Sequence, residues 1–297
     1  MTDIKGIICP ILTPMNEDES VNETELRHQV NRMIEAGIHG IFAFGTNGES
    51  YILSDSEKEF VLSVIIDETK KRVPVYSGTG CAGTKDTIRL SRKAKELGAD
   101  ILSIVAPYFA QASQEELYTH YKEVAESVDL PIVLYNIPAR AGNSLSPALV
   151  ERLSEVDNIV GAKDSSGNFD NMLQYIERTK GKDFAVLSGN DSLILWNLLA
   201  GGSGGIAGCS NVFPQNMVNI FQSFINGEID QARAYQDNIR SFRSCFKYGN
   251  PNTIVKTATA MLGYPVGKCR SPFNQLSEEA LAAIQQVLDD YKAKGIK

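Results

Sequence analysis

The sequence contains few of the residues that build metal and redox sites. Its 297 residues include five cysteines and three histidines, and no two cysteines form a CxxC pair. Without such a pair or a histidine cluster, a zinc site or a redox motif has no support. We expect the cysteines to be small buried hydrophobic residues of a protein in a reducing cytosol. They are Cys9, Cys81, Cys209, Cys245 and Cys269.

An excess of basic residues is also absent. The formal net charge is −7 at pH 7, with 29 lysines and arginines against 36 aspartates and glutamates. An acidic chain without basic clusters argues against nucleic acid and anionic membranes as partners. No apolar stretch approaches the length of a membrane span, and no basic segment followed by an apolar one stands at the N-terminus. We therefore expect a cytoplasmic protein.

The sequence does contain a repeated pattern, in which a short apolar run is followed by a segment with apolar residues at helical spacing. The pattern occurs about eight times, the number at which a parallel sheet closes into a (β/α)8 barrel, or TIM barrel. An open doubly wound sheet is the alternative. We predict strands at residues 6–10, 40–44, 73–76, 101–106, 132–135, 158–164, 185–187 and 205–207, and helices at residues 22–36, 56–69, 85–97, 113–127, 147–153, 168–179, 193–199 and 214–226.

The segment from residue 228 to the C-terminus has no candidate strand. It has three helical patterns, at residues 228–246, 252–261 and 277–292. No linker rich in glycine, serine or proline sets it apart, so an independent domain is not expected. We predict a barrel at residues 1–227 that carries the active site, and a helical extension at residues 228–297 that packs on it.

Lys163 ends the apolar run of residues 158–164. A run that is apolar on both faces is typical of a fully buried strand. A lysine at its C-terminal tip is either a snorkelling surface residue or an amine in a low-dielectric cavity, where burial favours the neutral, nucleophilic form. Active sites of barrels lie at this end of the strands, and Tyr135 ends the preceding strand. Its hydroxyl would lie beside Lys163 and transfer protons, unless Tyr135 is only a core aromatic residue.

Two more loops at the same ends of the predicted strands carry polar residues. Thr46 and Asn47 stand between two glycines, where consecutive backbone N–H groups suit a small carboxylate; a plain turn is the alternative. Arg140 follows the fifth strand. It is either a surface cation or a fork for a substrate carboxylate.

Two glycine-rich segments allow other interpretations. Gly78–Gly83 fits the GxGxxG pattern of dinucleotide sites, but the following strand has an acidic residue, Asp100, at its start rather than at its end, where a ribose would bind. This disfavours a dinucleotide cofactor. Residues 201–205 either bind phosphate or allow the last strand to close against the first, and the sequence leaves both possibilities open.

Three motifs together resemble the dihydrodipicolinate synthase/N-acetylneuraminate lyase family: Gly45–Glu49 (GTNGE), Tyr135–Pro138 (YNIP) and Gly161–Asp164 (GAKD). Each is weak alone, but their order and spacing are specific, and the resemblance extends over essentially the whole chain. It implies a (β/α)8 barrel, usually assembled as a homotetramer or dimer. The family forms a Schiff base between a lysine and pyruvate, or the pyruvyl end of a 2-keto acid.

The resemblance also implies roles for individual residues. Lys163 matches the Schiff-base lysine, and Tyr135 matches the tyrosine that shuttles protons and contacts the bound carboxylate. Thr46 matches the threonine that links this tyrosine to a second one, and the backbone at Thr46 and Asn47 matches the binding site of the pyruvate carboxylate. The residues that line the pocket next to the lysine are matched by Gly189 and Ile206.

This chemistry needs no metal and no organic cofactor. A neutral amine attacks the ketone of pyruvate, and the resulting iminium acts as an electron sink for loss of a methyl proton. The enamine then adds to an aldehyde. Run in reverse, the same steps cleave a carbon–carbon bond.

Some positions depart from the family pattern. Phe109 stands where the family usually has a tyrosine that is lent to the neighbouring subunit's site, so the hydroxyl relay through Thr46 is truncated; the adjacent Tyr108 is expected to point the other way. Asn47 replaces a more common threonine. Arg140 matches the arginine with which synthases hold the carboxylate of aspartate semialdehyde. We expect no feedback inhibition by lysine, because the corresponding positions hold Asp55, Lys58 and Ala82.

We therefore predict a Schiff-base-forming pyruvate lyase or synthase, similar to dihydrodipicolinate synthase, that condenses pyruvate with an aldehyde such as aspartate semialdehyde. An aldolase of 2-keto-3-deoxy sugar acids or of N-acetylneuraminate is the enzymatic alternative. A non-catalytic ligand-binding barrel is disfavoured by the presence of both Lys163 and Tyr135. The predicted catalytic residues are Lys163, Tyr135 and Thr46, and the predicted substrate-binding residues are Asn47, Arg140, Gly189, Ile206 and Phe109.

Overall fold

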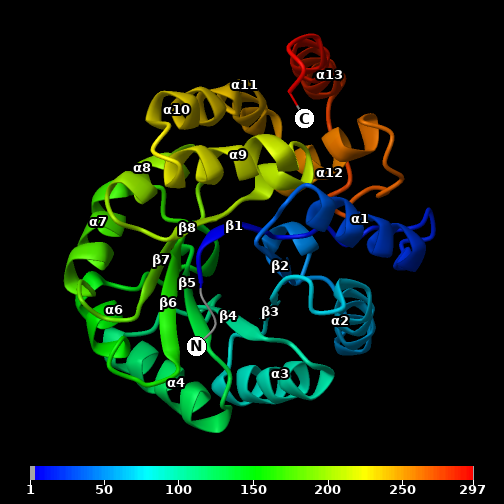
Figure 1. Ribbon diagram of the computed structural model, residues 1–297. Coiled ribbons are helices and arrows are strands. Elements are labelled where there is room, and N and C mark those ends of the chain that lie inside the picture. The colour runs from blue at the N-terminus through cyan, green and yellow to red at the C-terminus, as the bar shows by residue number, and fades with distance from the viewer. Residues whose placement is uncertain (1–3, 297) are drawn as a thin grey trace. The chain divides into compact units, whose positions relative to one another are not determined.

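The computed structural model, which describes residues 4–296, arranges eight strands in a closed barrel in the order β1 to β8 (Figure 1). This confirms the predicted TIM barrel over the open sheet. Residues 1–3 of the predicted barrel and residue 297 of the predicted extension lie outside the described residues. The strands are β1 (Gly6–Cys9), β2 (Gly40–Ala43), β3 (Val75–Gly78), β4 (Ile101–Val105), β5 (Ile132–Asn136), β6 (Ile159–Asp164), β7 (Ala185–Ser188) and β8 (Gly204–Ile206).

Several of the helices that follow the strands begin at side-chain caps that the sequence provides. Ser54 and Ser113 each form a capping box with the glutamate three residues on, which satisfies backbone N–H groups of the first turn. The α-helices are α1 (Glu23–Glu35), α2 (Asp55–Thr69), α3 (Thr84–Leu97), α4 (Gln114–Ser127), α5 (Pro138–Ala141), α6 (Pro147–Leu153), α7 (Phe169–Arg178), α8 (Ile194–Leu199), α9 (Pro214–Ile225), α10 (Ile229–Asn238), α11 (Arg240–Ser244), α12 (Pro251–Met261) and α13 (Glu278–Ala293). Short 3₁₀ helices are η1 (Thr46–Gly48), η2 (Asp191–Leu193), η3 (Gly208–Asn211) and η4 (Cys245–Tyr248).

The chain divides into two compact units. The first comprises the described part of Met1–Gly6 with Pro74–Ile206, and the second comprises Ile7–Val73 with Ala207–Lys297. In the first unit, strands β3 to β8 run parallel, and helices α3, α4, α6, α7 and α8 lie outside them (Figure 1). In the second unit, β1 and β2 run parallel. None of the helices within residues 4–296 is long and apolar enough to cross a membrane.

The glycine run at residues 201–205 serves close packing in the first unit. A Cβ atom on Gly204 would lie only 2.0 Å from the carbonyl oxygen of Gly6, the first residue of β1. The N–H of Gly6 also donates to the carbonyl of Ser203 at 2.8 Å. The structure therefore favours strand closure over phosphate binding, the two possibilities that the sequence left open.

The third strand begins two residues later than predicted, at Val75 instead of residue 73. Pro74 has no N–H group, so it cannot donate a hydrogen bond to a neighbouring strand. The N–H of Val75 instead donates to the carboxylate of Asp100 at 2.8 Å. This contact gives Asp100 a structural role at the start of β4.

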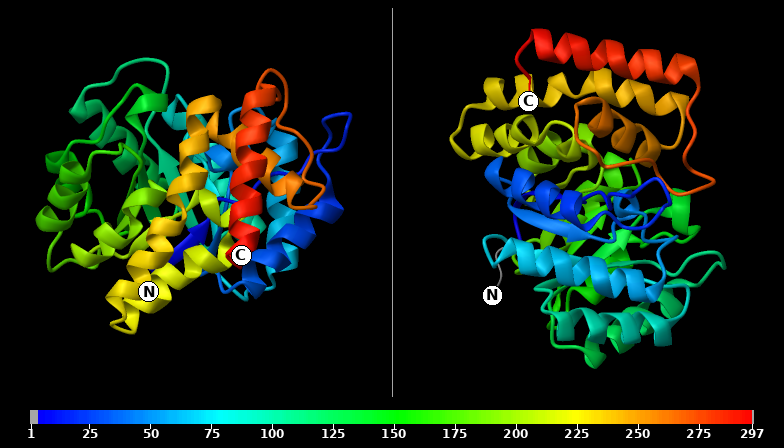
Figure 2. Two further views of the ribbon diagram at one scale, coloured as in Figure 1. Left: turned by 90° about the horizontal axis from the view of Figure 1, so that it is seen from above. Right: turned by 90° about the vertical axis from the view of Figure 1, so that its right-hand side faces the viewer.

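The predicted single helix at residues 228–246 is wrong, because the segment forms α10, α11 and η4 instead. The hydroxyl of Tyr291 accepts from the N–H of Phe242 at 3.2 Å and donates to the carbonyl of Asn238. A continuous α-helix would join that N–H to that carbonyl directly, so the inserted hydroxyl breaks the helix between them. Tyr291 comes from α13, and Figure 2 (right) shows α13 beside α10 and α11.

Candidate active site

Tyr135 and Lys163 lie side by side at the C-terminal ends of β5 and β6. Their Cα atoms are register partners, and Nζ of Lys163 lies 3.7 Å from the centroid of the Tyr135 ring. The two residues are 5% and 4% exposed, so Lys163 is a buried amine and not a snorkelling surface cation. An aromatic face attracts a cation in this position. The structure thus brings together the two residues that the sequence placed at the ends of adjacent strands.

A network of hydrogen bonds fixes the strand ends that carry this pair. Asn136, which follows Tyr135, donates from Nδ2 to Oδ1 of Asp164 at 2.8 Å, and Asp164 follows Lys163. The side-chain oxygen of Asn136 accepts from the N–H of Leu145 at 3.0 Å. Asp164 extends the network to the next strand, because its carbonyl accepts from the N–H of Gly189 at 2.8 Å. These contacts hold Tyr135 and Lys163 in a fixed register.

Sequence analysis assigned no role to Asn136 or Asp164, although a signal for them exists. Each is a polar residue on an otherwise buried strand, directly after a predicted catalytic residue, and the two are 0% and 2% exposed. Buried polar side chains are normally hydrogen-bonded, and two at equal offsets on adjacent strands are positioned to bond to each other. The spacing could therefore have predicted their contact.

Gly189 lies against Lys163. A Cβ atom at Gly189 would lie 2.9 Å from Cε of Lys163 and 1.9 Å from the hydroxyl oxygen of Ser165. Glycine therefore leaves room for both side chains. Ser165 is a third residue to which the sequence analysis assigned no role, and both its hydroxyl and Cε of Lys163 lie next to Gly189. Ile206, which is 1% exposed, follows Gly205, the register partner of Ser188, and so stands level with Gly189.

Arg140 and Phe109 are both exposed. Arg140 lies on the short helix α5, just beyond the end of β5. Phe109 is 101% exposed and has a φ of 79°, which is an unfavourable backbone conformation for a bulky residue. Tyr108 is 40% exposed, and burial raises the pKa of its hydroxyl, which interacts with the backbone of Ala82. The two neighbouring aromatic residues thus have different surroundings.

Thr46 and Asn47 belong to the second unit, where they open the 3₁₀ helix η1 after β2. The turn is closed by the N–H of Gly48, which donates to the carbonyl of Gly45 at 3.0 Å. The carbonyl of Thr46 accepts from Nδ2 of Asn252 on α12 at 2.5 Å. A Cβ at Gly208 would lie 2.6 Å from Nδ2 of Asn47. The loop is therefore held by several neighbouring segments of its own unit.

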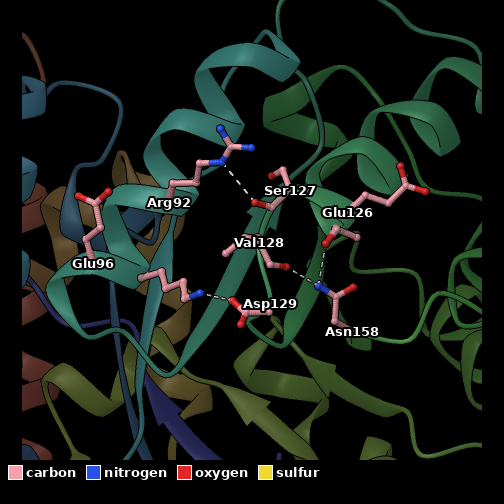
Figure 3. A pocket seen from close by; sticks show the side chains of 9 residues that line it. Arg92, Glu96, Glu126, Ser127, Val128, Asp129 and Asn158 are labelled. Atoms are coloured by element: carbon pink, nitrogen blue, oxygen red, sulfur yellow. Dashed lines mark hydrogen bonds and ion pairs between the residues drawn. The ribbon is translucent and has the colours of Figure 1, made fainter.

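A pocket of about 770 Å³ lies elsewhere in the first unit, at the N-terminal ends of β5 and β6 (Figure 3). Nδ2 of Asn158 donates to the carbonyl of Val128 at 2.8 Å, and Nε of Arg92 donates to that of Ser127 at 3.2 Å. These bonds satisfy carbonyls at the end of α4. None of the predicted site residues lines this pocket.

Comparisons with known proteins give the family of the chain. A sequence profile of the dihydrodipicolinate synthetase family matches residues 3–291. The chain belongs to this family. The family assignment and its relatives make it a class I lyase or synthase.

Relatives of this chain align with almost its whole length. The 4-hydroxy-tetrahydrodipicolinate synthase of Methanothrix thermoacetophila is 39% identical over 285 residues, which are 96% of each chain. The chloride-inhibited dihydrodipicolinate synthase of Acinetobacter baumannii, solved with pyruvate, is 35% identical with a TM-score of 0.94 and covers 99% of this chain and 100% of its own. A monomeric dihydrodipicolinate synthase variant is 30% identical with a TM-score of 0.94, and covers 97% of both chains.

Proposed function

We propose that this protein is a dihydrodipicolinate-synthase-like enzyme that forms a Schiff base between Lys163 and pyruvate and condenses the product with an aldehyde such as aspartate semialdehyde. The observation that carries the proposal is the buried contact between Lys163 Nζ and the Tyr135 ring, at 3.7 Å. This contact brings the amine of Lys163, a nucleophile, next to Tyr135, whose hydroxyl can carry protons. Both lie at the C-terminal ends of the barrel strands, where active sites of this fold are found.

The reaction follows from the chemistry of the amine. Nζ of Lys163 attacks the ketone carbon of pyruvate, and loss of water leaves an iminium. The iminium draws electrons from the methyl group, and the hydroxyl of Tyr135 relays the departing proton. The enamine carbon then attacks the aldehyde carbon, and the aldehyde oxygen takes up a proton. Water attacks the new iminium and releases both the product and the free amine.

Binding roles complete the proposal. We assign the pyruvate carboxylate to the backbone N–H groups at Thr46 and Asn47 in η1, because successive N–H groups in a tight turn form an anion site. We assign the carboxylate of the aldehyde to Arg140, whose exposed guanidinium can form two parallel charge-assisted hydrogen bonds. Gly189 and Ile206 shape the pocket beside the lysine.

Reductive trapping tests the proposal directly. Borohydride with pyruvate present should add one pyruvate-derived mass per chain, and peptide mapping should place it on Lys163. Borohydride without pyruvate is the control. The absence of an adduct, or an adduct on another lysine, would contradict the mechanism.

We further propose that the enzyme is a cytoplasmic homotetramer or dimer in which a second copy covers Phe109. A fully exposed phenylalanine with a φ of 79° is costly in a free surface loop, which supports a partner at this point. The monomeric relative shows that assembly varies among similar chains. Sedimentation of the wild type and Phe109→Ser tests this: we expect the variant to dissociate more readily, and a monomeric wild type would contradict the proposal.

A further inference from the structure

A fully buried ion pair joins the loop after β2 to the C-terminal helices of the same unit. Oε1 of Glu49 and Nζ of Lys256 are 2.6 Å apart, and their side chains are 0% and 1% exposed. Glu49 directly follows η1, and Lys256 lies on α12. When apolar side chains of similar volume replace a buried ion pair, the protein is often as stable as before or more stable. The pair therefore points to a requirement other than stability.

The remaining polar atoms of the pair hold the backbone around η1. Oε2 of Glu49 accepts from the N–H of Arg270 at 2.9 Å. Nζ of Lys256 donates to the carbonyl of Thr13 at 2.8 Å, and the hydroxyl of Thr13 donates to the carbonyl of Gly48, also at 2.8 Å. Glu49 itself has a φ of 57°, which persists in a non-glycine residue only where the surroundings enforce it. The network thus determines the path of the chain where η1 ends.

The start of η1 is held from the same helix. Asn252 lies one turn before Lys256 on α12 and is 1% exposed. Its Nδ2 donates to the carbonyl of Thr46 at 2.5 Å. Helix α12 therefore contacts η1 through Thr46 at its start and through Glu49 at its end.

The side chains around the pair are buried as well, and Cys269 is 2% exposed. Burial, together with the charge of Glu49, raises the pKa of the neighbouring Cys269 thiol to about 12. In such surroundings charges act on each other over longer distances than they do in water. An unpaired carboxylate at Glu49 would oppose the binding of an anionic substrate at η1.

We propose that Glu49, Lys256 and Asn252 are positioning residues that hold η1 in the geometry that binds the carboxylate of pyruvate. The inference rests on the proposed function, because it assigns that carboxylate to η1. Lys256 balances the charge of Glu49, so the glutamate fixes the loop without repelling the substrate. The helical segment after the barrel thereby contributes to substrate affinity.

Steady-state kinetics of Lys256→Met tests the proposal, because methionine keeps the length of the side chain and removes its charge. We expect KM for pyruvate to rise at least about 10-fold, while kcat and KM for the aldehyde change less than about 3-fold. Saturating pyruvate with borohydride should still label Lys163. The double variant Glu49→Gln/Lys256→Met removes both charges and should recover part of the lost affinity.

Two further variants separate positioning from folding. Asn252→Ala should raise KM for pyruvate in the same direction but less, and it decides the question if Lys256→Met does not fold. Ala258→Gly loosens α12 without removing a side-chain hydrogen bond, so it should lower Tm and leave this KM unchanged. If Lys256→Met and Asn252→Ala lower Tm but leave KM for pyruvate at the wild-type value, the pair is structural only. A wild type that forms no pyruvate adduct would instead overturn the proposed function on which the inference rests.

Discussion

Lys163 and Lys256 are both buried, yet their amines are held by different groups. Nζ of Lys256 lies 2.6 Å from a carboxylate oxygen of Glu49 and also donates to the carbonyl of Thr13. Nζ of Lys163 lies 3.7 Å from the centroid of the Tyr135 ring, at the end of a barrel strand. Burial alone therefore does not identify a reactive lysine. The groups around the amine, and its place in the fold, decide whether it holds the structure or attacks a carbonyl group.

The same methionine substitution at both lysines gives the largest expected contrast. Lys163→Met should abolish the pyruvate adduct and lower turnover roughly 10⁴-fold or more, because no other group forms the iminium. Lys256→Met should retain the adduct but lower the free energy of unfolding by about 3–5 kcal/mol, since it leaves a buried carboxylate unpaired. Mass spectrometry after borohydride and denaturant unfolding measure the two effects. If Lys163→Met still formed the pyruvate adduct, Lys163 would not be the Schiff-base lysine and the predicted contrast between the two lysines would be wrong.

Tyr135→Phe tests whether Tyr135 acts through its hydroxyl or only through the contact of its ring with Lys163. The substitution keeps the aromatic contact and removes the proton carrier, so turnover should fall roughly 10²–10⁴-fold while pyruvate binding changes less. Tyr118→Phe on α4 removes the hydroxyl of a tyrosine whose ring contacts Arg152 instead of Lys163, and it serves as the control. Wild-type turnover in Tyr135→Phe would mean that the tyrosine supports the amine only by packing.

Arg140→Ala sharpens the distinction between the pyruvate and aldehyde sites. Loss of the guanidinium should weaken use of aspartate semialdehyde by about 1.5–3 kcal/mol in kcat/KM, the range for hydrogen bonds to charged groups. The pyruvate adduct should form as in the wild type. Arg178→Ala, on the surface of α7, is the matched control, because that arginine pairs with Glu151 at an exposed site. Cleavage of a sugar acid by a wild type that ignores aspartate semialdehyde would favour the aldolase alternative.

His120 extends the comparison to a third buried basic side chain. It is 4% exposed, with Nδ1 at 2.9 Å from the hydroxyl of Thr84, and burial lowers its pKa from 6.5 to about 4. The unfolded chain binds a proton below pH 6.5 and the folded chain does not, so stability falls as the pH drops from about 6.5 to about 4. The loss should reach about 2 kcal/mol at pH 5. Thermal unfolding of the wild type and His120→Gln across this range measures it, and identical pH profiles would contradict it.

Much of the fold and part of the site could be predicted from local patterns. The alternation of apolar runs and amphipathic helices predicted the barrel, and the caps at Ser54 and Ser113 lie where the helices begin. The pairing of Tyr135 with Lys163 followed from their positions at the ends of consecutive strands. The break between α10 and α11 could not be predicted, because it depends on the hydroxyl of Tyr291, about fifty residues further along the chain.

The sequence by itself determined the closed barrel, the family and the placement of Tyr135 beside Lys163, because hydrophobic period and motif spacing are local properties of the chain. The tertiary structure alone decided what surrounds each buried amine. Glu49 and Lys256, for example, are separated by 207 positions and lie on different elements. Such contacts leave no periodic signal, since they depend on how distant segments pack. That packing gives two buried lysines of one chain different surroundings.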